Sequence, residues 1–214
     1  MTARWAVHDR IIVLCERLEI AAFVDYYIKY LRNQGEFLPE LRIVNINSLE
    51  NLLMYLQNLE AAEGFDKVEK ILLVADAGIK RRVTEHHIFK IKKHSFLQDF
   101  DFEMYLFPHK SEVGNWMPGF LEDLLLQALK QETSEYSNFY NLQNIAREYL
   151  FSVNISRSKE KRLQNYNRSF LYSYFAGTEK FVGLRMSEAA AKGAFDLEYK
   201  GFKDLREFLT GLEK

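Results

Sequence analysis

The strongest constraint on the fold is an alternation of two apolar patterns over roughly the first 130 residues. Short β-branched apolar runs predict buried strands, and segments in which apolar residues recur every three or four positions predict helices. The four runs that predict strands are 10–16, 41–46, 70–76 and 102–108. Nearly continuous apolar strands that alternate with helices predict a parallel sheet with both faces covered.

The helical segments complete this pattern. Their ranges are 19–33, 47–64, about 80–97 and 118–131. Asn47 can cap the second of them, and Gly64 can close it. From Glu132 onward every periodic segment predicts a helix. We therefore expect a compact α/β domain at 1–131 with a mainly parallel sheet of about four strands. A C-terminal α-helical extension at 132–214 is expected to pack on this domain, so that the two form one structural unit.

Charge and cysteine content limit the possible function classes. The 29 basic and 30 acidic side chains give a net charge of −1. Proteins that neutralise many phosphates usually carry a basic excess, so the overall charge does not favour avid binding of nucleic acid. The single cysteine, Cys15, excludes an internal disulfide, is typical of a reducing compartment and predicts a core residue. No signal peptide or membrane-spanning run is recognisable, so we expect a cytoplasmic protein that does not bind a membrane.

Two predicted strands end in a carboxylate, Glu16 after the first and Asp76 after the third. Ligands of open parallel sheets bind at the carboxyl ends of the strands, an edge called the rim below. If the two strands are neighbours, both acids lie at the rim and can bind Mg²⁺, which prefers oxygen ligands and stabilises the charge that develops as a phosphodiester breaks. The alternative is that these acids are solvated loop residues or helix N-caps.

Two more acids, Glu122 and Asp123, fall in the first turn of the helix predicted at 118–131. One interpretation is that they complement the helix dipole, which favours negative charge at that end. The other is that one of them turns back to the rim as an additional Mg²⁺ ligand.

Taken in order, Glu16, Asp76 and the segment "LFPHKSEVGNWMPGFLEDLLL" resemble the Toprim fold. The likeness is greatest to a mostly bacterial Toprim-like family of unknown function whose members carry a "FP…PG.LEDLL" segment. That family is related to the overcoming-lysogenization-defect nucleases. The resemblance covers about residues 8–131, and the tail also looks like the C-terminal helical region of the family.

The resemblance implies a three-layer Toprim-like domain and metal-dependent nuclease chemistry. In catalytic Toprim domains a glutamate after the first strand acts in acid/base chemistry, and Glu16 matches it. An Asp-x-Asp pair after the third strand binds Mg²⁺; Asp76 matches its first member, whereas Gly78 stands at the second position and has no side-chain oxygen. Glu122 or Asp123 would then be accessory metal ligands.

Two functions from different classes follow from this resemblance. The first is a Mg²⁺-dependent nuclease that acts on DNA or RNA, with a partner protein such as an ATPase, because related nucleases often work with one. The second is a Toprim-fold interaction or regulatory module that has lost catalysis, which Gly78, the near-neutral charge and the aromatic-rich tail favour. A protein that binds a small ligand or nucleotide at the same rim is a third possibility.

A basic segment at 79–94 follows Asp76 directly. The cations expected to contact nucleic acid are Lys80, Arg81, Arg82 and Lys90, with Lys110 in the loop after the fourth strand. They can guide a phosphate backbone to the rim, or they can form an ordinary solvated helix face with a mobile surface lysine nearby.

In the tail, Tyr166, Phe170 and Tyr174 recur every four residues, as in a base-stacking ladder or the buried side of a helix.

Overall fold

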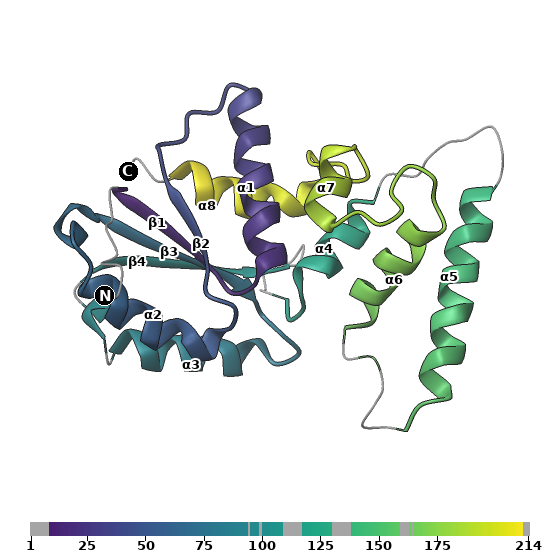
Figure 1. Cartoon of the computed structure of the whole chain (residues 1–214), viewed down its shortest axis with the longest axis horizontal. Coiled ribbons are helices and arrows are strands. Elements are labelled where there is room, and N and C mark those ends of the chain that lie inside the picture. The colour runs from purple at the N-terminus through teal and green to yellow at the C-terminus, as the bar shows by residue number, and fades with distance from the viewer. Residues whose placement is uncertain are drawn as a thin grey trace, which may run out of the picture.

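The structure is a computed structural model that describes residues 9–93, 95–98, 100–108, 117–129, 138–158, 163 and 165–211, of which 138–141 are described by their backbone alone. It is an α/β protein with a four-stranded, all-parallel sheet, as the apolar alternation predicts (Figure 1). The strands are β1 (Ile11–Cys15), β2 (Arg42–Asn45), β3 (Lys70–Asp76) and β4 (Asp101–Phe107). Their order is β2-β1-β3-β4, so the two most apolar strands, β1 and β3, lie side by side in the middle.

Alternate residues of the central strands supply two separate cores. Val13 and Leu72 belong to the core on one face of the sheet, and Leu14 and Leu73 belong to the core on the other. This period of two is what a strand buried on both faces requires. The second face is covered by α2 (Leu52–Glu60) and α3 (Arg81–Lys93), which lie together below the sheet in Figure 1.

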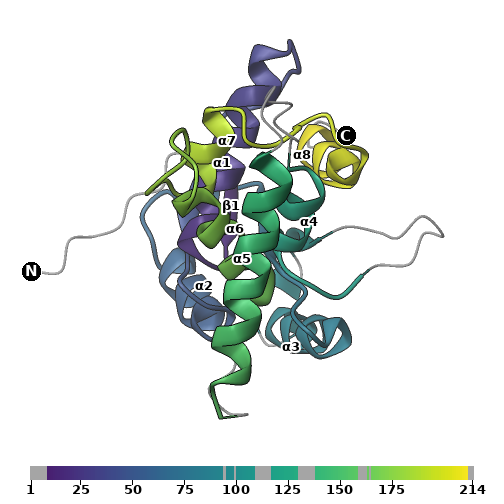
Figure 2. The same cartoon turned by 90° about the vertical axis from the view of Figure 1, so that its right-hand side faces the viewer.

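The core on the first face is shared by α1 and by helices from the C-terminal part of the chain; the helices Asn138–Ile155 and Tyr166–Ala176 among them lie beyond the carboxyl end of the sheet, at the right of Figure 1 and toward the viewer in Figure 2. These helices are α1 (Leu18–Asn33), α4 (Leu121–Gln127), α5 (Asn138–Ile155), α6 (Tyr166–Ala176), α7 (Met186–Ala191) and α8 (Lys203–Thr210). Phe202, just before α8, stacks on Phe23 and packs against Tyr27, both on α1. The expected C-terminal helices are therefore confirmed, and their side chains share one core with α1.

Several local expectations need correction. Asn47 does not cap a helix, because its backbone is left-handed (φ 66°) and its side chain bonds Asn45 instead. A short 3-10 turn, Leu49–Asn51, precedes α2, which ends at Glu60, before Gly64. Phe170 and Tyr174 are buried, so they line the inner side of α6 and do not form an exposed stacking ladder.

Among the described residues, no helix has the length and apolar content to cross a membrane.

Candidate functional site

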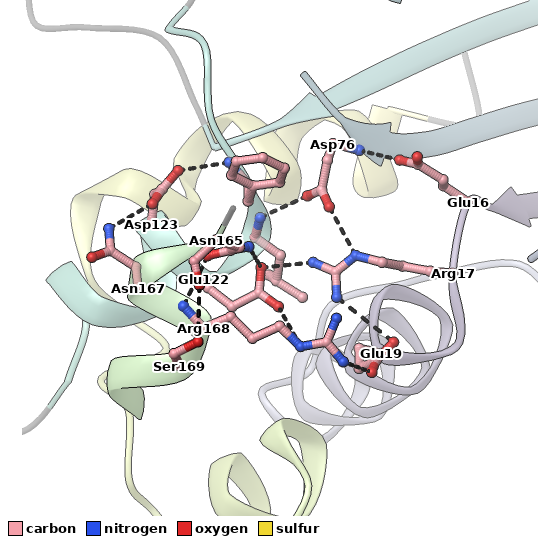
Figure 3. Close-up of polar contacts among 12 residues, drawn as sticks. Glu16, Arg17, Glu19, Asp76, Glu122, Asp123, Asn165, Asn167, Arg168 and Ser169 are labelled. Atoms are coloured by element: carbon pink, nitrogen blue, oxygen red, sulfur yellow. Dashed lines mark hydrogen bonds and ion pairs between the residues drawn. The ribbon is translucent and has the colours of Figure 1, made fainter. Parts of the chain in front are cut away.

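The rim brings together Glu16, which follows β1, and Asp76, the last residue of β3 (Figure 3). Because β1 and β3 are parallel neighbours in register, with Cys15 opposite Val74, their carboxyl ends emerge side by side. The backbone amide of Asp76 donates a hydrogen bond to Glu16 Oε2 at 2.8 Å. The contact therefore joins the Glu16 carboxylate to the backbone of Asp76; it does not direct the two carboxylates to a common point.

Arg17 stands between two carboxylates of the rim. Its Nε donates to Asp76 Oδ2 at 2.8 Å, and its Nη2 donates to Glu122 Oε2 at 2.7 Å. The other oxygen of Asp76, Oδ1, accepts the backbone N–H of Leu121 at 2.7 Å. All three side chains are largely shielded from water, at 17% exposed for Arg17, 7% for Asp76 and 0% for Glu122. Both oxygens of Asp76 are therefore already in use within the protein.

A second arginine extends this network to the C-terminal helices. Arg168, on α6, forms an ion pair with Glu19 on α1, and its Nε lies 3.9 Å from Glu122 Oε1. Asn165, which caps α6, donates to Glu122 Oε2 at 3.2 Å. Arg17 Nη1 and Glu122 Oε1 are the two buried side-chain atoms in the described residues that lack a hydrogen bond, and each has only a longer contact with an opposite charge. The acids at the rim thus connect the sheet to the helical region.

Glu122 and Asp123 have different roles although they are adjacent. Glu122 turns back to the rim, as one interpretation of the sequence proposed. Asp123 instead accepts the backbone N–H of Phe120 at 2.7 Å and the side-chain amide of Asn167 at 2.6 Å. Asp123 therefore holds the first turn of α4 and one residue of α6 through hydrogen bonds, a structural role of another kind than the dipole interaction that the other interpretation gave it.

Burial dominates the electrostatics of the acids. Removal from water raises the pKa of Asp76 to about 7, although the nearby charge of Arg17 acts in the opposite direction. Burial also raises the pKa of Glu16, while the Asp76 amide and Arg17 partly offset that effect. Burial alone would lower the pKa of Arg17, but the charges of Asp76 and Glu122 outweigh it and raise this pKa above its ordinary value. Arg17 is therefore a permanent cation at the rim.

The residues at the rim do not fit a Mg²⁺ ion as they are arranged. Mg²⁺ needs several oxygens in near-octahedral geometry, whereas those of Asp76 accept from Arg17 and Leu121. Gly78 adds no side-chain oxygen, and its backbone pairs with Gly119 through two hydrogen bonds of 2.8 Å. Within the part of the chain that the structure describes, no group of three or more His, Cys, Asp or Glu side chains could hold a metal.

The basic segment after Asp76 divides into a structural arginine and an exposed face. The Arg81 side chain is largely buried; it donates to Glu85 Oε1 at 2.7 Å and to the Leu106 carbonyl at 3.2 Å, so it ties α3 to the end of β4. The exposed cations along α3, called the α3 basic face below, are Lys80, Arg82, Lys90 and Lys93. None of these four forms an ion pair with a described acidic residue. Lys110 lies outside the described residues.

The sequence analysis missed Arg17, Glu19 and the two α6 residues that complete the network. The available signal was the charge cluster "ERLE" at 16–19, directly after an apolar strand. The side chain of a residue next to a strand end can turn either to the rim or to solvent, and the pattern alone does not decide between them. Comparison of the chain with protein-family models, with curated proteins and with solved structures gives no match.

Proposed function

We propose that this chain is a Toprim-like interaction or regulatory module in which an arginine has replaced the metal ion at the rim. The observation that carries the proposal is the Arg17 guanidinium, which donates to Asp76 at 2.8 Å and to Glu122 at 2.7 Å. A guanidinium is a permanent cation with donors in a fixed plane, so it can satisfy carboxylates that would otherwise be available as ligands of a divalent ion.

Arg17 also makes later binding of a metal ion unfavourable. A Mg²⁺ ion could reach Asp76 and Glu122 only if Arg17 left, and that would break a largely buried ion pair. Such a break typically costs about 3 kcal/mol or more, which corresponds to a loss of roughly 150-fold or more in metal affinity. Gly78 offers no side-chain oxygen to compensate.

The test is to remove the arginine and look for a metal site. Mn²⁺ binding would be followed by electron paramagnetic resonance and calorimetry for the wild type, Arg17→Ala and the double variant Arg17→Ala/Asp76→Ala. We expect no saturable binding by the wild type, a gain of binding in Arg17→Ala, and its loss in the double variant. Arg82→Ala, which removes an exposed arginine, should behave as the wild type. Wild-type binding of Mn²⁺ that Asp76→Ala abolishes would contradict the proposal.

The Mg²⁺-dependent nuclease, with or without an ATPase partner, stays a prediction from the resemblance, and cleavage assays test it directly. Single-stranded, double-stranded and transfer nucleic acids would be incubated with the protein and Mg²⁺ or Mn²⁺. We expect no difference between the wild type, Glu16→Ala and Asp76→Ala. Metal-dependent cleavage by the wild type that either variant abolishes would support the nuclease and overturn our proposal.

A second observation favours nucleic acid as the partner of such a module. Lys80, Arg82, Lys90 and Lys93 are exposed on and beside α3 and have no acidic partner among the described residues. The N-terminus of α3 lies at the rim, where Arg81 bonds the Leu106 and Met117 carbonyls, and from there the α3 basic face runs back beneath the sheet (Figure 1). A row of unpaired cations can contact a phosphate backbone without any cleavage chemistry.

A further inference from the structure

Helix α3 has an inner side that packs on the sheet and an outer side that carries an exposed aromatic ring. Ile88 and Ile91 on the inner side are buried in the second core. No described element lies over the outer side of α3 in either view (Figures 1 and 2). Phe89 belongs to this outer side, and its side chain is 64% exposed although the next residue along the chain on either side of Ile88 and Ile91 differs in burial.

Phe89 differs from other phenylalanines on this side of the sheet because its ring has no partner. Phe65 and Phe100 stack on each other with ring centroids 5.7 Å apart. The ammonium of Lys92 lies 5.4 Å from the centre of the Phe102 ring. Within the part of the chain that the structure describes, neither a second ring nor a cation contacts the ring of Phe89 in this way. One face of an aromatic ring is therefore available to a ligand.

The Phe89 ring lies in a row of cations. Arg82, Phe89 and Lys93 are spaced i, i+7 and i+11, so they share one stripe of the helix. Along the axis, Lys93 lies about 6 Å from Phe89 on one side and Arg82 about 10 Å on the other. Both cations belong to the α3 basic face and lack a described acidic partner. The acid one turn before Phe89 is Glu85, whose charge Arg81 compensates at 2.7 Å.

We propose that the α3 basic face binds single-stranded nucleic acid, with Phe89 stacked on a base and with Arg82 and Lys93 at the phosphates on either side. This inference rests on the nucleic-acid partner proposed above. Cations alone would favour a duplex, because a duplex has the higher charge density. An aromatic ring favours a single strand, because the bases of a single strand can leave their stack and pack on the ring, whereas those of a duplex are paired inside it.

An anionic membrane surface is a poorer match to the same helix. A helix that lies on a membrane inserts a continuous apolar side between the lipids and keeps its cations on the opposite side. The apolar side of α3, with Ile88 and Ile91, is already packed on the sheet. On the outer side, charged residues separate the exposed apolar ones, Val83 and Phe89. Charge and a single stacking ring therefore fit a nucleic-acid strand better than a lipid surface.

Fluorescence anisotropy of the full chain tests the inference with three probes of equal length. They are a single-stranded oligonucleotide, the same strand with every base removed, and a duplex. We expect the wild type to bind the strand with bases at least fivefold more tightly than either other probe. Phe89→Ala should weaken its binding by roughly 5- to 150-fold, as for the loss of one stacked base, without a change in salt slope. Phe89→Trp should keep the preference.

Phe151→Ala is the matched control, because Phe151 lies on α5 and is also 64% exposed. It should bind all three probes as the wild type does, and circular dichroism checks that each variant is folded. The double variant Arg82→Glu/Lys90→Glu should weaken binding of all three probes and reduce the salt slope, because it removes phosphate contacts and leaves the ring in place.

These variants separate a failure of this inference from a failure of the nucleic-acid partner itself. Salt-dependent binding that Arg82→Glu/Lys90→Glu weakens but Phe89→Ala does not would leave the partner standing and overturn the stacking role. Equal or tighter binding of the base-free strand or the duplex by the wild type would overturn it as well. Binding of vesicles rich in phosphatidylserine without binding of any oligonucleotide, or no binding at all, would overturn both proposals.

Discussion

At the residue scale, Arg17 and Gly78 determine the charge and the side-chain oxygens at the rim. Arg17 places a permanent positive charge beside Asp76 and Glu122. Gly78 has no side chain, so it lacks the oxygens that an aspartate at this position would have. Gly78 also has a left-handed backbone (φ 66°), which a glycine adopts without strain. An aspartate introduced at position 78 would have a strained left-handed backbone, and its neighbour Asp76 would still be paired with Arg17.

The raised pKa of Asp76 predicts a pH dependence of stability. Because this pKa is about 7 in the folded protein and near its ordinary acidic value in the unfolded chain, the folded state binds the proton more tightly. The contribution of Asp76 to the free energy of unfolding is therefore full below the unfolded pKa and is lost as pH rises to about 7. Urea titrations between pH 4 and 8 should show this decline in the difference between the wild type and Asp76→Asn. A difference that is constant with pH would contradict it.

Gly119 predicts a steric limit at the same rim. Its φ is 143°, and a Cβ built on it would overlap Asp123 Oδ2, which holds the first turn of α4. We expect Gly119→Ala to lower the free energy of unfolding by about 1–3 kcal/mol through strain and displacement of Asp123. Gly211→Ala is the control, since nothing lies within 4 Å of its Cβ position and its φ is −76°. Equal urea midpoints for both variants would argue against this role of Gly119.

At the element scale, the strands were more predictable than the helix ends. The ranges predicted for the strands agree with β1 to β4 within a few residues, because continuous apolar runs are distinctive. Helix boundaries depend on local bonds that the pattern does not contain. The Asn45–Asn47 side-chain bond replaced the expected cap, for example, and the second helix begins only after a 3-10 turn.

The α3 basic face predicts salt-dependent binding of nucleic acid. Replacing Arg82 and Lys90 by glutamate should weaken binding of a single-stranded oligonucleotide at least tenfold and reduce the salt slope by about 1.4, because each lost phosphate contact contributes roughly 0.7. Fluorescence anisotropy at several salt concentrations measures both quantities. Lys29→Glu is the control, because Lys29 is exposed on α1 and pairs with Asp25. If the control weakens binding as much as the α3 variant does, α3 is not the binding surface.

At the scale of the whole molecule, the sheet and the C-terminal helices were predictable separately, but the contacts between them were not. A periodic pattern shows which side of a helix is buried without showing its partner. The partners of Glu122 on α6, Asn165 and Arg168, are more than 40 residues away in the chain. The boundary expected at 131/132 falls within residues that the structure does not describe, so it stays a prediction.

The shared core predicts that the α/β part does not fold alone. A chain of residues 1–131 would lose Phe202 and the rest of the helical contribution to the core around Phe23 and Tyr27. We expect the full chain to unfold in one cooperative transition and the fragment to lack a cooperative transition. Denaturant titrations followed by circular dichroism compare them. A fragment that unfolds cooperatively near the wild-type midpoint would mean that the helical region is a separate domain.

The position of the single cysteine gives the chain a built-in reporter. Cys15 lies in β1, between β2 and β3, and it is fully buried. Burial raises the pKa of this thiol, so the reactive thiolate does not form while the sheet is intact. An alkylating reagent can reach the sulfur only when β1 separates from its neighbours. The alkylation rate of the unmodified protein therefore reports how often its central sheet opens. A bound partner that holds the sheet closed would lower this rate.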